Sequence, residues 1–158
     1  MRGQADAAEV RLTCSVEPAT PAVRANPEKL QRVLFNLIDN ALRHTPSDGS
    51  VSIEASAGDG GWVEVTVSDT GEGIAEADRA RVFEPFFRGG PATSCPRNGA
   101  GLGLPICRAI VQAHGGEIEL VDTPSGSRVR FTVPAFDASA TGPATSREGL
   151  RRDAVNGS

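Results

Sequence analysis

The stretch NPEKLQRVLFNLIDNALRH, residues 26–44, carries the signals of one long amphipathic helix. Asn26 is a favourable N-cap residue, and Pro27 suits the first helical position. Apolar residues then recur at helical spacing and form one stripe: Leu30, Val33, Leu34, Leu37, Ile38 and Ala41. Thr45-Pro46 follows, and because a residue before proline avoids the helical region, we expect the helix to end near His44.

A second line of residues on this helix is polar. Asn36, Asn40 and Arg43 fall within about 60° of one another and roughly 120° from the apolar stripe. One interpretation is that the amide oxygens bind a hard cation such as Mg²⁺, which is usually shared with phosphate, and that Arg43 meets an anion. The alternative is a solvated helix face, and this helix alone does not distinguish the two.

The segments around the helix predict a mixed sheet. Alternating residues predict strands at 10–16, 51–55, 62–68, 117–121 and 128–133, and further helices are expected at 75–83 and 104–113. Asp59-Gly60-Gly61 predicts a hairpin turn, and Gly115-Gly116 a left-handed helix end. Residues 88–101 lack periodicity, and long loops of this kind are often lids or binding loops. Because strands outnumber βαβ units, we expect an α+β fold with helices on one face of the sheet.

Two glycine-rich segments could contact a ligand. Asp69-Thr70-Gly71-Glu72-Gly73-Ile74 follows a strand, where a carboxylate can accept a hydrogen bond from an amino group such as adenine N6. Glycine there lets the backbone approach a flat ligand, although the segment could equally be a simple turn. Gly99-Ala100-Gly101-Leu102-Gly103-Leu104 precedes a helix whose exposed amides can bind phosphate, and it could equally be a hinge. It matches neither the dinucleotide fingerprint nor the P-loop.

These segments occur in one order, with Phe83-Glu84-Pro85-Phe86-Phe87-Arg88 between the last two. The arrangement resembles the ATP-binding catalytic domain of bacterial sensor histidine kinases, within the superfamily of gyrase, Hsp90 and MutL ATPases. Residues 36–41 look like the family's N box, residues 69–73 its G1 box, residues 83–87 its F box and residues 99–103 its G2 box. The resemblance covers about residues 20–135 and implies a two-layer α/β sandwich of the Bergerat type.

The resemblance also implies roles for the matching residues, with ATP and Mg²⁺ as the ligands. Asn40 would coordinate Mg²⁺, with Asn36 near the phosphates as a candidate second ligand, and Asp69 would bind the adenine amino group. The other residues implied in ATP binding are Arg43, His44, Gly71, Gly73, Ile74, Arg88, Arg97, Gly99, Gly101, Leu102, Gly103 and Leu104. The F-box phenylalanines would anchor the lid by packing into the core.

Composition and charge narrow the function classes. The 158 residues suffice for one domain, and a net charge of -4 provides no basic field for nucleic acid. No apolar run is long enough for a membrane span and no signal-peptide core is present, so we expect a cytoplasmic protein or the cytoplasmic part of a membrane-bound sensor. The three cysteines predict neither a disulfide framework nor a zinc site. We expect an N-terminal segment with one strand at 1–19, a kinase domain at 20–136 and a disordered tail at 137–158.

The phosphoacceptor box of the family is missing from the sequence. His44 ends the first long helix, and for His114, which precedes a glycine pair, a packing or capping role is expected. The resemblance therefore implies that the histidine that receives the γ-phosphoryl group lies on a separate dimerisation segment or chain. A response regulator would be an indirect partner, and the isolated chain is expected to be a monomer. We assign no general base, because nothing in the spacing supports Asp39 or Glu84.

Two alternatives stay open. A serine kinase of the anti-sigma-factor type would also lack its own phosphoacceptor, although the F box and the long loop favour the histidine-kinase branch. The second alternative is a scaffold module whose nucleotide pocket no longer functions. Acid treatment separates the two kinases, because phosphohistidine is lost in acid and phosphoserine survives.

Overall fold

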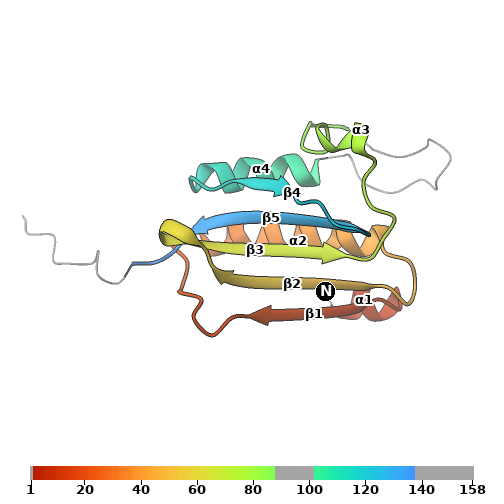
Figure 1. Ribbon diagram of the computed structural model, residues 1–158, viewed down its shortest axis with the longest axis horizontal. Helices are drawn as coiled ribbons and strands as arrows, with labels where there is room; N and C mark the ends of the chain where they lie inside the picture. Colours follow the sequence, from red (N-terminus) through yellow and green to blue (C-terminus); the bar gives the residue numbers. More distant parts are fainter. Residues whose placement is uncertain (1, 88–101, 138–158) are drawn as a thin grey trace, which may run out of the picture.

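The computed structural model describes residues 2–87 and 102–137, which form one sheet with helices against one face (Figure 1). The elements in chain order are α1 (Arg2–Ala7), β1 (Arg11–Val16), α2 (Pro27–His44), β2 (Ser50–Ala57), η1 (Asp59–Gly61), β3 (Trp62–Asp69), α3 (Glu76–Arg79), α4 (Gly103–Ala113), β4 (Ile118–Leu120) and β5 (Ser127–Pro134). The predicted long loop at 88–101 and the predicted tail, apart from Asp137, lie outside the described residues.

The sheet is mixed, with the strand order β1-β2-β3-β5-β4. β1 runs parallel to β2, and every other neighbouring pair is antiparallel. The register places Asp69, the last residue of β3, opposite Ser127, the first residue of β5. The expected α+β fold, with helices on one face of a mixed sheet, is confirmed.

The helix α2 forms as its sequence predicts. The Asn26 side chain accepts a hydrogen bond from the Lys29 N–H at 3.1 Å, which satisfies one free amide of the first turn. At the other end, the Thr45 hydroxyl donates to the Ala41 carbonyl at 2.7 Å. α2 packs on β2 and β3, and α4 packs on α2, β4 and β5. No helix in the described part of the chain combines the length and apolar character needed to cross a membrane.

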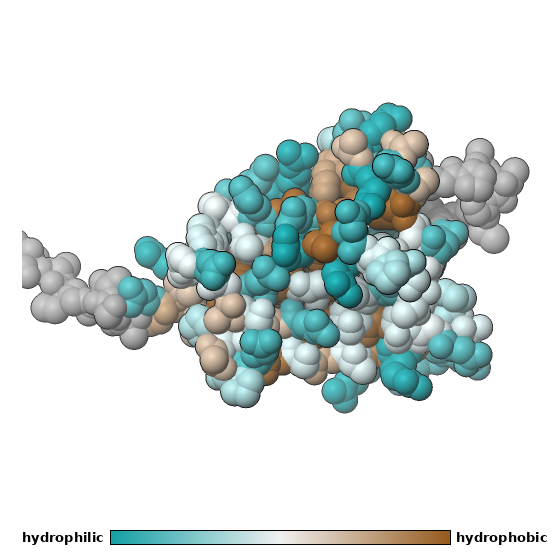
Figure 2. All heavy atoms as spheres, in the orientation of Figure 1, coloured by the Kyte–Doolittle hydropathy of each residue, from teal (hydrophilic) through white to brown (hydrophobic). Residues whose placement is uncertain are grey.

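The core lies between these two helices and one face of the sheet. Alternate strand residues point inward and are buried, as are the residues of the facing helix stripes: Val51, Ile53, Val63, Val65, Val67, Val129, Phe131, Val133, Val33, Leu37, Ala41, Cys107 and Val111. The opposite sheet face is covered mainly by hydrophilic and neutral residues, as the space-filling view shows (Figure 2). This alternation is the period-two pattern that the sequence shows in each strand.

Three elements differ from the sequence-based expectation. The six-residue α1 was not predicted, because it is too short to show a helical period; tertiary packing holds it, since Ala5 and Val10 are buried. α3 spans only Glu76–Arg79, shorter than the predicted 75–83. β4 spans only Ile118–Leu120, shorter than the predicted 117–121, whereas the strand predicted at 10–16 forms as β1, an edge strand of the sheet.

Candidate nucleotide-binding site

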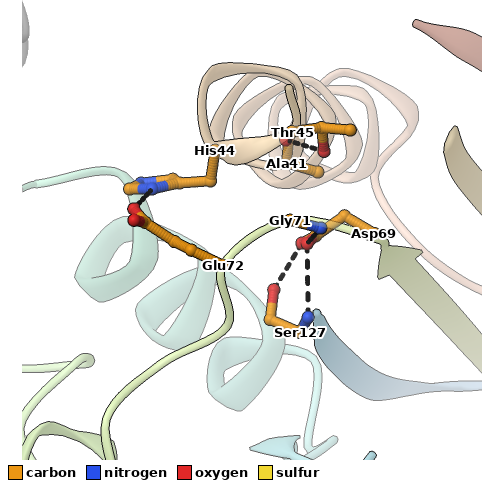
Figure 3. Close-up of polar contacts among 7 residues, drawn as sticks. All are labelled: Ala41, His44, Thr45, Asp69, Gly71, Glu72 and Ser127. Atoms are coloured by element: carbon orange, nitrogen blue, oxygen red, sulfur yellow. Dashed lines mark hydrogen bonds and ion pairs between the residues drawn. The ribbon is translucent and has the colours of Figure 1, made fainter. Parts of the chain in front are cut away.

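Asp69 is a buried carboxylate at the end of β3, with 7% of its surface exposed. Its Oδ1 atom accepts the Gly71 N–H at 2.9 Å and the Ser127 N–H at 3.2 Å. Its Oδ2 atom accepts the Ser127 hydroxyl (Figure 3). These donors come from two separate segments and fix the orientation of the carboxylate, which is the property needed for recognising one amino group.

The backbone around Asp69 is packed so closely that it requires glycine. A Cβ on Gly71 would lie 2.2 Å from the carbonyl oxygen of His44, so this turn touches the end of α2. A Cβ on Gly126 would lie 1.8 Å from the Asp69 carbonyl oxygen, and Gly126 has a φ of +70°. The end of α2, the turn after β3 and the turn before β5 therefore meet at one point.

His44 lies beside the same turn. Its Nδ1 atom is 3.4 Å from Oε1 of Glu72, so the last residue of α2 is joined to the glycine-rich segment (Figure 3). Gly73 has a φ of +76°, and a Cβ there would lie 2.8 Å from the Gly126 carbonyl oxygen. Ile74, the next residue, is half-buried. The structure thus brings together the residues expected at the adenine end.

The polar line of α2 continues from this point along the helix. Asn36 and Asn40 are both half-buried, and the Asn36 Nδ2 atom is buried with no hydrogen-bond partner among the described residues. Arg43 pairs with Asp39 at 2.8 Å across one helical turn. Apart from the Cys107 thiol, whose pKa this amide lowers, no described group satisfies the Asn36 amide, so Asn36 marks the polar line as a place where a further group could bind.

Cys107 of α4 packs against α2 beneath this line. Its side chain is fully buried, and its Sγ atom lies 3.6 Å from the Val33 carbonyl oxygen. Burial raises the pKa of the Cys107 thiol to about 11, and the nearby Asn36 amide opposes this rise only in part. The thiol is therefore neutral at physiological pH and acts as a small apolar side chain.

The start of α4 is the third part of the expected site. Leu102 is the N-cap residue, its carbonyl accepts the Ile106 N–H at 3.0 Å, and Gly103 is exposed as the first helical residue. Leu104 is half-buried against the core. The other expected phosphate-side residues, Arg88, Arg97, Gly99 and Gly101, lie outside the described residues.

The F-box phenylalanines do not behave as one group. Phe83 and Phe87 are half-buried, with the guanidinium groups of Arg108 and Arg81 at 5.9 and 4.5 Å from the respective ring centres. Phe86 is 73% exposed and has a φ of +63°. The expectation that all three pack into the core is wrong for Phe86, because its left-handed backbone turns the ring outward.

His114 has the capping role expected of it. Its Nε2 atom accepts the Asn26 N–H at 3.1 Å, and its Nδ1 atom lies 2.8 Å from the Ile110 carbonyl oxygen. The neutral ring with its proton on Nδ1 satisfies both contacts. This histidine therefore joins the end of α4 to the start of α2.

Ser127 is the site residue that sequence analysis missed. Ser127 follows Pro124, Ser125 and Gly126 in the chain, and nothing local in the sequence marks it as a site residue. Only the register of β3 and β5, which sets Asp69 opposite Ser127, reveals its contact. Cross-strand register is a long-range property and is not visible in a single segment.

Comparison with known proteins places this geometry in a family. A sequence family described as histidine kinase-, DNA gyrase B- and HSP90-like ATPases matches residues 25–137. The adaptive-response sensory kinase SasA of Synechococcus sp. (strain JA-2-3B'a(2-13)) is 41% identical over 117 residues, which cover 73% of this chain and 30% of SasA. The chain thus spans about a third of the length of the curated relatives it matches.

Solved structures agree with the sequence match. Full-length ShkA in complex with AMPPNP superposes with a TM-score of 0.74 at 32% identity, over 86% of this chain and 28% of ShkA. The nucleotide-free catalytic domain of the histidine kinase ThkA gives a TM-score of 0.74 at 27% identity, over 85% of this chain and 84% of that one. The chain therefore belongs to the histidine kinase-, DNA gyrase B- and HSP90-like ATPase family, and its fold is that of histidine kinase catalytic domains.

Proposed function

We propose that this chain is the catalytic part of a two-component sensor kinase, which binds Mg-ATP and passes the γ-phosphoryl group to a histidine on a separate dimerisation segment or chain. The observation that carries the proposal is the fixed, buried carboxylate of Asp69 beside the glycine turn and the end of α2. The phosphorylated histidine would then supply a response regulator.

The adenine end follows from the hydrogen bonds already made. Both N–H donors occupy Oδ1 of Asp69, and a carboxylate oxygen can accept more than one hydrogen bond. The adenine amino group is a donor and complements the remaining acceptor capacity of this carboxylate. Gly71 leaves no side chain between the turn and a flat base, and His44, held at Glu72, would border the ring.

The phosphate end is supported by the residues of α2 and α4. The amide oxygens of Asn36 and Asn40 are of the kind that Mg²⁺ prefers as ligands. The buried Nδ2 atom of Asn36 is a donor and would suit a phosphate oxygen rather than the cation. Among the described residues no group of three or more His, Cys, Asp or Glu side chains could hold a metal. Two amide oxygens would fill only part of the six-ligand shell of Mg²⁺, so the cation would be shared with phosphates, which bring their own oxygens. Arg43 would contact phosphate while it stays near Asp39.

Bound Mg-ATP supplies the phosphoryl group and part of the charge stabilisation for in-line transfer. The chain's own residues would bind and orient the nucleotide: Asp69 would select the base, the amides of α2 would hold the phosphate end, and the start of α4 at Gly103 would present backbone N–H groups to phosphate. Asp39 and Glu84 are each ion-paired, with Arg43 and Arg81, so neither is offered as the general base.

Calorimetric titration tests the proposal, with a non-hydrolysable ATP analogue, with and without Mg²⁺. We expect binding that requires Mg²⁺ for full affinity and that the Asp69→Asn variant loses. Gln31→Ala, a change at an exposed position of α2, is the matched control and should bind as the wild type does. No binding to the correctly folded wild-type chain would contradict the proposal and favour the scaffold reading.

A second experiment identifies the acceptor. The chain is incubated with labelled ATP and a candidate phosphoacceptor segment, and the product is treated with acid. Label that is lost in acid and stable in base supports phosphohistidine. Label that survives acid would contradict the histidine-kinase assignment and favour the serine-kinase alternative.

A further inference from the structure

The strand β1 leaves one edge of the sheet open. It stands first in the strand order, and Thr13, Cys14, Ser15 and Val16 are all exposed, with 62% of the Val16 surface accessible. Figure 1 shows β1 along the lower edge of the sheet, with α1 at its start rather than along its free edge. An open strand edge presents main-chain donors and acceptors to another chain.

The main-chain hydrogen bonds show which groups face outward. The Arg11 N–H donates to the Gly49 carbonyl and the Glu17 N–H donates to the Ala55 carbonyl, each at 2.9 Å. Hydrogen bonding alternates along a strand, so odd-numbered residues bond to β2. The N–H and C=O groups of Leu12, Cys14 and Val16 therefore point away from the sheet.

This edge is complementary to itself when it is turned antiparallel about Cys14. Cys14 then faces Cys14 of a second copy, and Leu12 faces Val16, so all the outward main-chain groups of these residues find partners. The register with β2 puts these three side chains on the helix-bearing face, where they would form one apolar strip across the junction. Thr13 faces Ser15 on the other face.

Charge adds a second reason for this pairing. In the same register Arg11 of one copy stands opposite Glu17 of the other, and the two-fold symmetry repeats the pair. Neither residue makes an ion pair with any other residue in the described part of the chain. Opposite charges directly across a strand pair stabilise it, and like charges destabilise it.

We propose that two copies of this chain associate through β1, antiparallel about Cys14, and so join their sheets into one continuous sheet. The inference goes beyond the proposed kinase function and departs from the monomer expected from sequence. Arg11 of β1 is paired with Ser50 of β2. The residue after Ser50, Val51, is paired with Asp69 of β3, so the candidate nucleotide site lies toward the Arg11 end of β1. Antiparallel pairing sets the two sites at opposite ends of the junction, and nucleotide binding does not depend on it.

Sedimentation of the full chain over a wide concentration range tests the proposal. One pair of six-residue strands is expected to bury less than the roughly 1,200 Å² at the lower limit of stable complexes, so we expect a weak, concentration-dependent dimer. Arg11→Glu and Glu17→Arg should each raise the dimer dissociation constant by about tenfold or more, since each sets like charges opposite one another twice. An equal mixture of these two variants, or the double variant, should recover association, because opposite charges then face one another again.

Oxidative cross-linking reports the register. In a Cys95→Ser background, diamide should join Cys14 to Cys14: the two thiols lose two protons and two electrons to the N=N bond, and one S–S bond forms. Directly opposed residues of a hydrogen-bonded pair lie about 5.5 Å apart at Cα, within the range for a disulfide. The control Cys14→Ser/Ser15→Cys moves the thiol to the other face and out of opposition, and should cross-link much more slowly.

The controls keep the outcomes separate. Thermal unfolding and nucleotide-analogue binding of each variant should match the wild type, which distinguishes a lost dimer from a lost fold or a failed kinase assignment. A chain that stays monomeric at millimolar concentration overturns the proposal. So does a dimer that both single charge reversals leave unchanged, which would indicate another surface.

Discussion

The substitution Asp69→Asn changes one oxygen of the site for an amino group and leaves its shape intact. Oδ1 of Asp69 accepts two backbone N–H groups, from Gly71 and Ser127. The asparagine oxygen must therefore take the Oδ1 position, and its NH₂ group the Oδ2 position. The Ser127 hydroxyl, which donates to Oδ2, can rotate and accept instead. We expect the fold to survive at a cost of about 1 kcal/mol.

The effect on nucleotide binding should be larger. If Asp69 binds the base as proposed, the adenine amino group would lose a charged acceptor and meet another donor. A hydrogen bond to a charged group contributes about 1.5–3 kcal/mol, which corresponds to a roughly 10- to 150-fold weaker ADP affinity. Inosine diphosphate carries an oxygen at the same ring position, so the new NH₂ group can donate to it. The preference for ADP over IDP should therefore shrink or reverse.

Calorimetric titration of wild type and Asp69→Asn with Mg-ADP and Mg-IDP measures this preference. Urea denaturation followed by the fluorescence of the single tryptophan, Trp62, measures stability on the same samples. The ratio of the two dissociation constants is the decisive quantity, because a general loss of folded protein leaves the ratio unchanged.

Two results would refute the reasoning. If Asp69→Asn keeps the wild-type ratio of ADP to IDP affinity, Asp69 does not contact the base. If the variant unfolds under native conditions, the Asp69 carboxylate is a structural group whose hydrogen bonds to Ser127 hold β3 and β5 in register. Ser127→Ala, which removes only the hydroxyl, separates these cases, since it should weaken stability without reversing the base preference.

Three further outcomes follow from the packing. Leu37→Ala should lower the free energy of unfolding by about 2–5 kcal/mol in urea titration, because Leu37 is buried in the core. Gly126→Ala should destabilise more than Gly61→Ala in the same assay; both have positive φ, but only at Gly126 does a Cβ meet a backbone atom, at 1.8 Å. Stability should fall between pH 9 and 11 by about 1.4 kcal/mol per pH unit, because the unfolded Cys107 thiol ionises there while burial keeps the folded one protonated; Cys107→Ala should lose this slope.

Local chemistry made the helices and strands of the core predictable. The cap at Asn26, the apolar stripe of α2 and the proline after Thr45 each act within a few residues, and the structure confirms the helix end they indicate. The short α1 escaped prediction because it depends on the burial of Ala5 against distant residues.

The candidate site was predictable only in part, for a similar reason. Asp69 and Gly71 belong to one segment whose glycine content predicts a tight turn. In the structure this turn lies so close to the end of α2 that a Cβ at Gly71 would clash with it. Ser127 and Gly126 lie far along the chain and reach Asp69 only through the pairing of β3 with β5. A single sequence carries no local mark of such a pairing.

The ion pairs and hydrogen bonds of the acidic residues and of His114 bear on which group could act as the general base. Asp39, in the N box, and Glu84, in the F box, each form an ion pair with an arginine of their own segment. Drawing either away to accept a proton would leave its arginine without that partner. His114 is committed at both ring nitrogens to holding two helices together. The described part of the chain is therefore equipped to bind and orient a nucleotide, and we expect the group that activates the acceptor histidine to reside on the acceptor's own segment.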